Sequence, residues 1–188
     1  MLTVPLSYAC GCLSFALLAA RLRGVDIRAH GSGNPGATNV GRVLGPAWGR
    51  AVLLLDILKG WLPVWLLTAP LDVPGWVSDS EGKVLLAAAA VLGHIYPITA
   101  RFRGGKGVAT LVGGLLALDV VLGAIAVLVH VVVKKGLRFV SLASVALAWS
   151  FPAAQLAAQA LGLEGRQTDG VLAMVGLAVL VTVRHRDN

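Results

Sequence analysis

The sequence predicts an all-α integral membrane protein, a compact bundle of about seven transmembrane helices that forms one domain over residues 1–188. Composition supports this class: 57% of residues are hydrophobic and 13% are charged, against roughly 25% charged in soluble domains. Mean hydropathy is +0.81. The apolar runs are continuous and about 20 residues long, which favours membrane-spanning helices over alternating strands.

The first three expected spans each follow an apolar run. The second is unusual because it contains Asp56 and Lys59, three residues apart on one helix face. These two charges either neutralise each other or support a site from beneath. Cys10 and Cys12 lie within the first run and are interpreted as packing residues. The three spans cover residues 2–20, 47–69 and 84–100.

The run 108–133 has two interpretations. As one helix it would carry Asp119 near the bilayer centre, at a cost of about 2.5–3.5 kcal/mol on insertion scales. Two short spans that turn near Asp119 avoid this cost. Residues 139–162 and 170–183 complete the set, so the choice at Asp119 decides between six and seven spans.

The distribution of the basic residues favours seven spans. With the N-terminus outside and the C-terminus cytoplasmic, most of the 16 lysines and arginines fall in cytoplasmic loops, and Lys83 and Arg166 remain outside. Six spans would put the last two basic clusters outside. The net charge of +7 is therefore explained by the basic residues that set membrane topology. We expect no nucleic-acid partner.

The first polar motif is RAHGSGNPGATNVGR, residues 28–42, between two apolar runs. Closely spaced glycines let backbone N–H groups approach an anion, and arginine binds phosphate or carboxylate with two parallel hydrogen bonds. The motif therefore predicts an anion site. Its candidate residues are Gly31, Ser32, Gly33, Asn34, Gly36, Thr38, Asn39 and Arg42.

Three further polar motifs share the predicted cytoplasmic side. In the first of them, Gly104, Gly105, Lys106 and Gly107 lead into an apolar helix, whose N-terminus would favour an anion. A plainer interpretation, attraction of basic loops to lipid headgroups, is preferred for Arg21, Arg23, Arg50, Lys134 and Lys135. His130 lies in an apolar run and is interpreted as structural, and His30 as a solvated loop residue. The three motifs span residues 93–110, 134–144 and 184–188.

Several familiar motifs are absent or out of context. The literal G-x-G-x-x-G at residues 31–36 follows no strand, which excludes a dinucleotide fold. Lys106 is followed by glycine, so residues 104–107 are not a P-loop, and no G-x-S-x-G serine motif is present. No cluster of histidines and carboxylates suits a metal. We expect no metal and no cofactor.

Six segments, taken together, resemble the membrane-bound acyl-phosphate:glycerol-3-phosphate acyltransferase family of bacteria. The resemblance covers essentially the whole chain, in order and with compatible spacing. In that family the last pattern continues as I-x-R-L, whereas this sequence ends at Asn188, so we expect either a truncated sequence or a missing basic contact. The segments are GSGNPGATNVGR (31–42), DILKG (56–60), GHIYP (93–97), FRGGKGVAT (102–110), SLAS (141–144) and HRDN (185–188).

The resemblance implies a single transmembrane catalytic domain in the bacterial cytoplasmic (inner) membrane, with its active site facing the cytoplasm. It implies transfer of a fatty acyl group from acyl phosphate to the 1-hydroxyl of glycerol 3-phosphate, giving lysophosphatidic acid and phosphate. This is the first step of phospholipid synthesis. Acyl phosphate is already activated, so we expect direct transfer without a covalent acyl-enzyme. The expected partners are the two substrates and membrane lipids, and we expect a monomer.

The hypothesised roles follow the motifs. Backbone N–H groups of residues 31–36, with Ser32 and Asn34, hold the acyl phosphate and stabilise the oxyanion. His185 or the substrate phosphate accepts the proton, and Asn188 orients the hydroxyl. The alternative function is a small anion channel or transporter, although no internal repeat is evident. The other hypothesised substrate-binding residues are Thr38, Asn39, Arg42, Gly104, Gly105, Lys106, Gly107, Ser141, Ser144 and Arg186.

Overall fold

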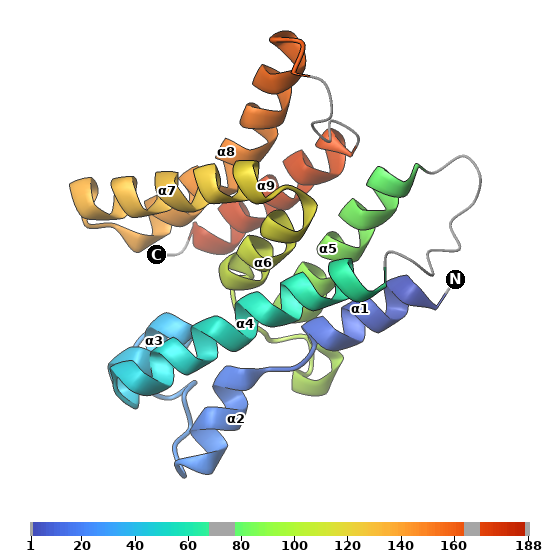
Figure 1. Ribbon diagram of the computed structural model, residues 1–188. Coiled ribbons are helices and arrows are strands. Elements are labelled where there is room, and N and C mark those ends of the chain that lie inside the picture. The colour runs from blue at the N-terminus through green and yellow to red at the C-terminus, as the bar shows by residue number, and fades with distance from the viewer. Residues whose placement is uncertain (1, 68–77, 164–169, 187–188) are drawn as a thin grey trace.

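The computed structural model describes residues 2–67, 78–163 and 170–186 (Figure 1). Within these ranges the chain is all-α, with nine α-helices, one short 3-10 helix and no strand. The elements are α1 (Thr3–Gly11), α2 (Phe15–Leu22), α3 (Ala37–Val43), α4 (Pro46–Leu66), α5 (Asp79–Ile95), η1 (Ile98–Ala100), α6 (Val108–Leu118), α7 (Val120–Leu137), α8 (Val140–Ala160) and α9 (Val171–His185).

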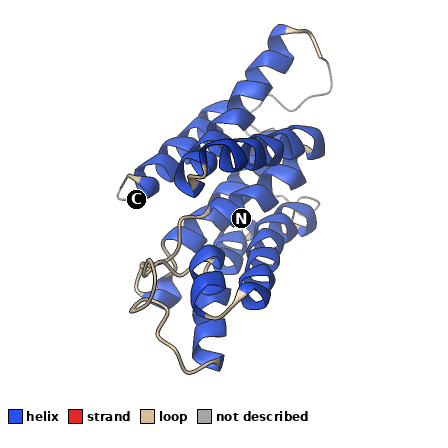
Figure 2. Cartoon of the chain, turned by 90° about the vertical axis from the view of Figure 1, so that its left-hand side faces the viewer, coloured by secondary structure: helices blue, strands red, loops and turns tan. Residues whose placement is uncertain are grey.

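Each predicted span corresponds to helical structure. Among the described residues, four segments are long and apolar enough to cross a membrane: Thr3–Leu22, Asp79–Ala100, Val120–Leu137 and Val140–Ala160. Helix α4 has 21 residues but carries Arg50, Asp56 and Lys59, and α6 and α9 are shorter apolar helices. In Figure 2 the described loops gather on the same side of the bundle as the C-terminal end of the chain. The polar motifs therefore share one end of the bundle.

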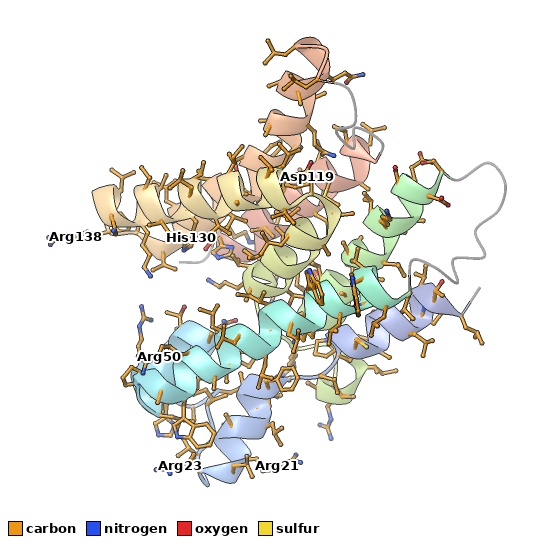
Figure 3. The ribbon with its side chains drawn as sticks, viewed as in Figure 1. Arg21, Arg23, Arg50, Asp119, His130 and Arg138 are labelled. Carbon is orange, nitrogen blue, oxygen red and sulfur yellow. The ribbon has the colours of Figure 1, made fainter. Side chains whose placement is uncertain are left out.

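The run 108–133 is two helices, because the chain turns at Asp119. This residue has extended backbone angles, φ −150° and ψ 113°. Its Oδ1 accepts the N–H groups of Val121 at 2.8 Å and Leu122 at 2.9 Å, which caps α7. Figure 3 shows Asp119 at one end of α7 and Arg138 at the other. The predicted turn at Asp119, which divides this run into two helices, is confirmed.

One expected span is interrupted, and one expected loop is partly helical. The first span is not continuous, because residues 12–14 separate α1 from α2, and Ser14 caps α2 by accepting the Leu17 N–H at 3.4 Å. The break leaves the Leu13 carbonyl outside any helix, where Lys59 Nζ donates to it at 2.6 Å. The polar motif 28–42 is also not wholly a loop, because its last part, residues 37–42, belongs to α3.

Glycines allow the helices to approach closely. A Cβ at Gly11 would meet the Ala90 backbone of α5, and one at Gly113 would meet the Ile57 backbone of α4. Small residues serve this purpose in membrane bundles. Both glycines therefore permit close helix packing, whereas a Cβ on Gly176 would meet nothing within 4 Å.

Among the described residues, the two largest apolar cores lie in different groups of helices. The larger core joins α5 to α9 and includes Val91, Leu115 and Phe151. The smaller core joins α2, α3 and α4 and includes Ile27 and Val40. Side chains from all four sequence motifs line a cavity that is bounded by helices of both groups.

Candidate active site

The four polar motifs converge on one cavity of about 410 Å³, which we call the catalytic cavity. Its wall is formed by α3, by the segment preceding it and by α4 to α9. The predicted site residues in this wall are Ser32, Asn34, Gly36, Thr38, Asn39, Arg42, Lys106, Gly107, Ser141, Ser144 and His185. The wall does not include Gly31, Gly33, Gly104, Gly105 or Arg186, and Asn188 lies outside the described residues.

Asn39 shapes the glycine loop, residues 28–36, from inside. Its side chain is 1% exposed, and its Oδ1 accepts the Ser32 N–H at 2.9 Å. Its Nδ2 donates to the carbonyls of Ile27 at 3.1 Å and His30 at 3.0 Å. A Cβ on Gly31, whose φ is 61°, would collide with this amide. Asn39 thus folds the loop that presents Ser32 and Asn34.

Most of the N–H groups of the glycine loop are engaged within the protein. The Gly33 N–H donates to His30 at 3.0 Å and the Gly36 N–H donates to Asn34 at 2.9 Å. The Ser32 N–H donates to Asn39. These N–H groups therefore contribute to the fold of the loop, and the role of its backbone in an oxyanion site stays a prediction. The side chains of Ser32, Asn34 and Thr38, which line the cavity, are the better donors.

The second motif places Lys106 and Gly107 in the wall and uses its first two glycines for packing. Gly104 and Gly105 donate their N–H groups to Ile95 at 3.0 Å and His94 at 3.1 Å. A Cβ on either would collide with the end of α5. Gly107, with φ 83°, precedes α6 in a left-handed conformation that suits glycine. This fixed turn brings half-buried Lys106 to the cavity.

The third and fourth motifs contribute hydroxyl and imidazole groups. The Ser144 hydroxyl donates to the Val140 carbonyl at 2.8 Å, so its proton is already used within α8. His185 Nδ1 lies 2.8 Å from the Val181 carbonyl, which can only accept, so Nδ1 carries the proton. In neutral His185 the other nitrogen, Nε2, is therefore an acceptor. It can take a proton from a substrate hydroxyl as a base, or accept a hydrogen bond from that hydroxyl.

A buried ionic network lies against the cavity. Lys59 Nζ is 2.8 Å from Asp56 Oδ1, with side chains 3% and 2% exposed. His94 Nδ1 lies 3.7 Å from the same oxygen and 3.1 Å from the Thr110 hydroxyl. Asp56 and His94 also line the cavity. The structure agrees with both interpretations of Asp56 and Lys59. The two charges form an ion pair, and this pair lies against the cavity.

Sequence reasoning missed other residues of the wall. His130 and Lys134, assigned to packing and to lipid attraction, lie one turn apart on α7 and line the cavity. Figure 3 shows His130 on the side of α7 that faces α3 and α4. Arg184 does not line the cavity, but its Nη2 lies 3.5 Å from the Gly105 carbonyl and its guanidinium 5.8 Å from the centre of the Tyr96 ring. One feature of the sequence could have identified His130 as a site residue: it is a histidine near the polar end of an apolar run.

Comparisons with known proteins agree with this architecture. A family model described as glycerol-3-phosphate acyltransferase matches residues 1–188. The glycerol-3-phosphate acyltransferase of Desulforudis audaxviator is 42% identical over 189 residues, covering 100% of this chain and 89% of the relative. That of Aquifex aeolicus is 36% identical over 185 residues, covering 98% and 91%.

Solved structures of an integral membrane glycerol 3-phosphate acyltransferase, PlsY (YgiH), are also similar. The crystal structure in the glycerol 3-phosphate form superposes with a TM-score of 0.85 at 35% identity, covering 99% of this chain and 88% of that one. The lysophosphatidic acid form gives 0.83 at 34% identity, covering 99% and 87%. This chain is an integral membrane protein that belongs to the glycerol-3-phosphate acyltransferase family.

Proposed function

We propose that the protein transfers a fatty acyl group from acyl phosphate to the 1-hydroxyl of glycerol 3-phosphate in the catalytic cavity, giving lysophosphatidic acid and phosphate. The observation that carries this proposal is the meeting of Arg42, Lys106 and His185, from three motifs, in one cavity among membrane helices. Two cations suit phosphorylated substrates, and the membrane supplies the acyl chain. The related structures in glycerol 3-phosphate and lysophosphatidic acid forms support the acceptor and the product.

Glycerol 3-phosphate is held by its phosphate. Arg42 reaches the cavity from α3 and Lys106 from the turn before α6. Arginine offers a planar pair of donors and lysine a compact charge. Ser141, at the start of α8, adds a hydroxyl to the wall. Ser144 contributes less, because its proton is donated to Val140.

Acyl phosphate reacts on the other side of the cavity. Ser32, Asn34 and Thr38 donate hydrogen bonds to its phosphate and to the oxyanion that develops at its carbonyl. The 1-hydroxyl oxygen of glycerol 3-phosphate forms the new bond to the carbonyl carbon, and the bond from that carbon to the phosphate oxygen breaks. Phosphate is a good leaving group in this mixed anhydride, so transfer is direct and no acyl-enzyme forms.

The hydroxyl proton goes to His185 Nε2 or to a substrate phosphate. His185 Nδ1 is held by Val181, which fixes the ring and leaves Nε2 as the acceptor. We assign the base role to His185, since it lies in the same wall as Arg42 and Lys106. The proposed role of Asn188, orienting the hydroxyl, rests on the sequence motif alone.

The proposed setting is the bacterial inner membrane, with the protein as a monomer and the catalytic cavity open to the cytoplasm, where glycerol 3-phosphate is found. The basic loops near the cavity favour this orientation through the positive-inside rule. Membrane lipids surround the helices and deliver the acyl donor.

The test is direct. Purified protein in vesicles is incubated with palmitoyl phosphate and glycerol 3-phosphate, and lysophosphatidic acid and free phosphate are quantified. We expect one phosphate released for each lysophosphatidic acid formed. Phosphate uptake into the vesicles without product would contradict the proposal and favour the anion transporter.

A further inference from the structure

A second cavity, of about 620 Å³, lies between α2, the loop that follows it and the turn after η1. We call it the arginine groove, and it shares no lining residue with the catalytic cavity. We propose that the arginine groove binds the phosphate headgroup of an anionic phospholipid from the surrounding membrane.

The groove concentrates unpaired positive charge. Arg21, Arg28, Arg101 and Arg103 line it, together with one carboxylate, Asp26. Asp26 Oδ1 accepts the backbone N–H of Arg28 at 3.0 Å, so this oxygen is bonded within its own loop. Within the described ranges none of the four guanidinium groups forms an ion pair. An anion would relieve their mutual repulsion, and arginine binds phosphate oxygens in pairs.

One contact fixes the groove. Arg28 Nη2 donates to the Arg103 carbonyl at 2.6 Å, joining the loop after α2 to the turn after η1 across 75 residues of sequence. The two walls of the groove are thereby held at a set spacing, which a diffuse patch of basic loops would not require. The groove is therefore part of the fold.

Exposed apolar side chains on the same elements, outside the lining of the groove, favour a lipid over free phosphate. On the elements that form the groove, Leu18 is 51% exposed, Leu22 68%, Ile98 64% and Phe102 58%. Basic groups flanked by exposed apolar groups match a molecule whose charged head lies at the interface and whose chains enter the membrane. Free phosphate would gain nothing from these four side chains.

The groove is linked to the catalytic cavity by the glycine loop. Ile27 lines the groove, and its carbonyl accepts the Asn39 Nδ2 at 3.1 Å. Asn39 lines the catalytic cavity and holds Ser32. A headgroup bound between Arg28 and Arg103 would steady this loop at its base. We therefore expect anionic lipid to raise the acyltransferase rate.

The test compares a groove variant, Arg101→Gln with Arg103→Gln, with a control of equal charge, Arg23→Gln with Arg138→Gln. In Figure 3, Arg23 points away from Arg21 at the end of α2, and Arg138 lies at the far end of α7. Neither Arg23 nor Arg138 lines the arginine groove or the catalytic cavity. Each protein is extracted from nanodiscs of phosphatidylcholine and phosphatidylglycerol, and the retained lipid is measured by native mass spectrometry.

We expect the wild type and the control to retain phosphatidylglycerol. The groove variant should bind it roughly 25-fold more weakly, from roughly fivefold for each arginine near an anionic headgroup. Equal loss in the groove variant and the control would overturn the proposal in favour of general charge attraction. Displacement of phosphatidylglycerol by inorganic phosphate alone would also overturn it, because the groove would then be a free-phosphate site.

If the glutamine pair does not fold, Arg101→Lys with Arg103→Lys carries the test. Lysine keeps the charge but loses the paired hydrogen bonds, so we expect intermediate retention with unchanged thermal stability. Retention equal to that of wild type would overturn a specific headgroup site. The lipid measurement needs no acyl donor, so its outcome is independent of the proposed reaction.

Discussion

Asn34 and Asn39 lie five residues apart, and the structure gives them different roles. Asn39 is buried with three hydrogen bonds, whereas Asn34 is half-buried and lines the cavity. Asn39→Ala should lower the free energy of unfolding by about 1–3 kcal/mol, because its backbone partners lose their bonds. Asn34→Ala should leave stability unchanged and lower kcat by about 10²–10³-fold. Thermal unfolding and initial rates separate the two, and equal loss of stability would contradict this assignment.

A variant at His185 tests the proposed proton transfer. If its Nε2 is the base, His185→Ala should lower kcat by about 10²–10⁴-fold with a small change in KM for glycerol 3-phosphate. His30→Ala is the matched control, because His30 is an exposed histidine outside the cavity wall. A raised KM with turnover retained would rule out the base role and leave His185 as a binding group.

A variant at Asp56 tests how much the buried ion pair contributes to stability. Asp56→Asn leaves the Lys59 charge buried without its carboxylate, which should lower the free energy of unfolding by about 3–5 kcal/mol. Adding Lys59→Met should recover much of this loss, because the buried charge is removed. Unfolding in mixed detergent micelles measures both variants. If Asp56→Asn alone is as stable as the wild type, the ion pair contributes little to stability.

At the scale of elements, the turn between α6 and α7 depends on one cap. Asp119→Ala removes the acceptor of two N–H groups and should cost about 0.5–2 kcal/mol of stability. Asp119→Asn is the matched control, since asparagine is an equally good N-cap. Because Asp119 lies outside the catalytic cavity, we expect both variants to keep the wild-type rate. A large loss of rate in the alanine variant alone would couple this turn to the site.

The helices were largely predictable, because bilayer length and the cost of a buried charge decide them locally. Asp119 is the clearest case, since its charge forced a turn. The break at residues 12–14 was not predictable, because the Leu13 carbonyl depends on Lys59, 46 residues away. The start of α3 was missed for a related reason: the hydrogen bonds of Asn39 to the preceding loop shape this segment.

At the scale of the whole molecule, the motifs predicted which residues meet but not which face the cavity. Gly104 and Gly105 pack against α5, while Lys106 beside them lines the wall. His130 enters the wall because the α6–α7 turn brings α7 back over α4, which its own apolar surroundings do not reveal. Such outcomes depend on long-range packing.

The proposed orientation can be tested on the whole molecule in cells. Single cysteines replace Glu81, before the first turn of α5 is complete, and Lys135, near the end of α7, in a variant lacking Cys10 and Cys12. An impermeant maleimide added outside should label position 81 and not position 135, following the positive-inside rule. The reverse pattern would contradict a cytoplasmic catalytic cavity.

The most direct measurement of the central claim is the initial rate of lysophosphatidic acid formation from glycerol 3-phosphate with palmitoyl phosphate as the acyl donor. Wild type and Lys106→Ala are compared in nanodiscs, with mass spectrometry of the protein during turnover. We predict rapid product formation, no acylated protein, and a kcat/KM for glycerol 3-phosphate lowered by about 10–100-fold in the variant, from the loss of a charged hydrogen bond. Product formation only from another acyl donor, or acylated protein that accumulates and then decays into product, would contradict direct transfer from acyl phosphate.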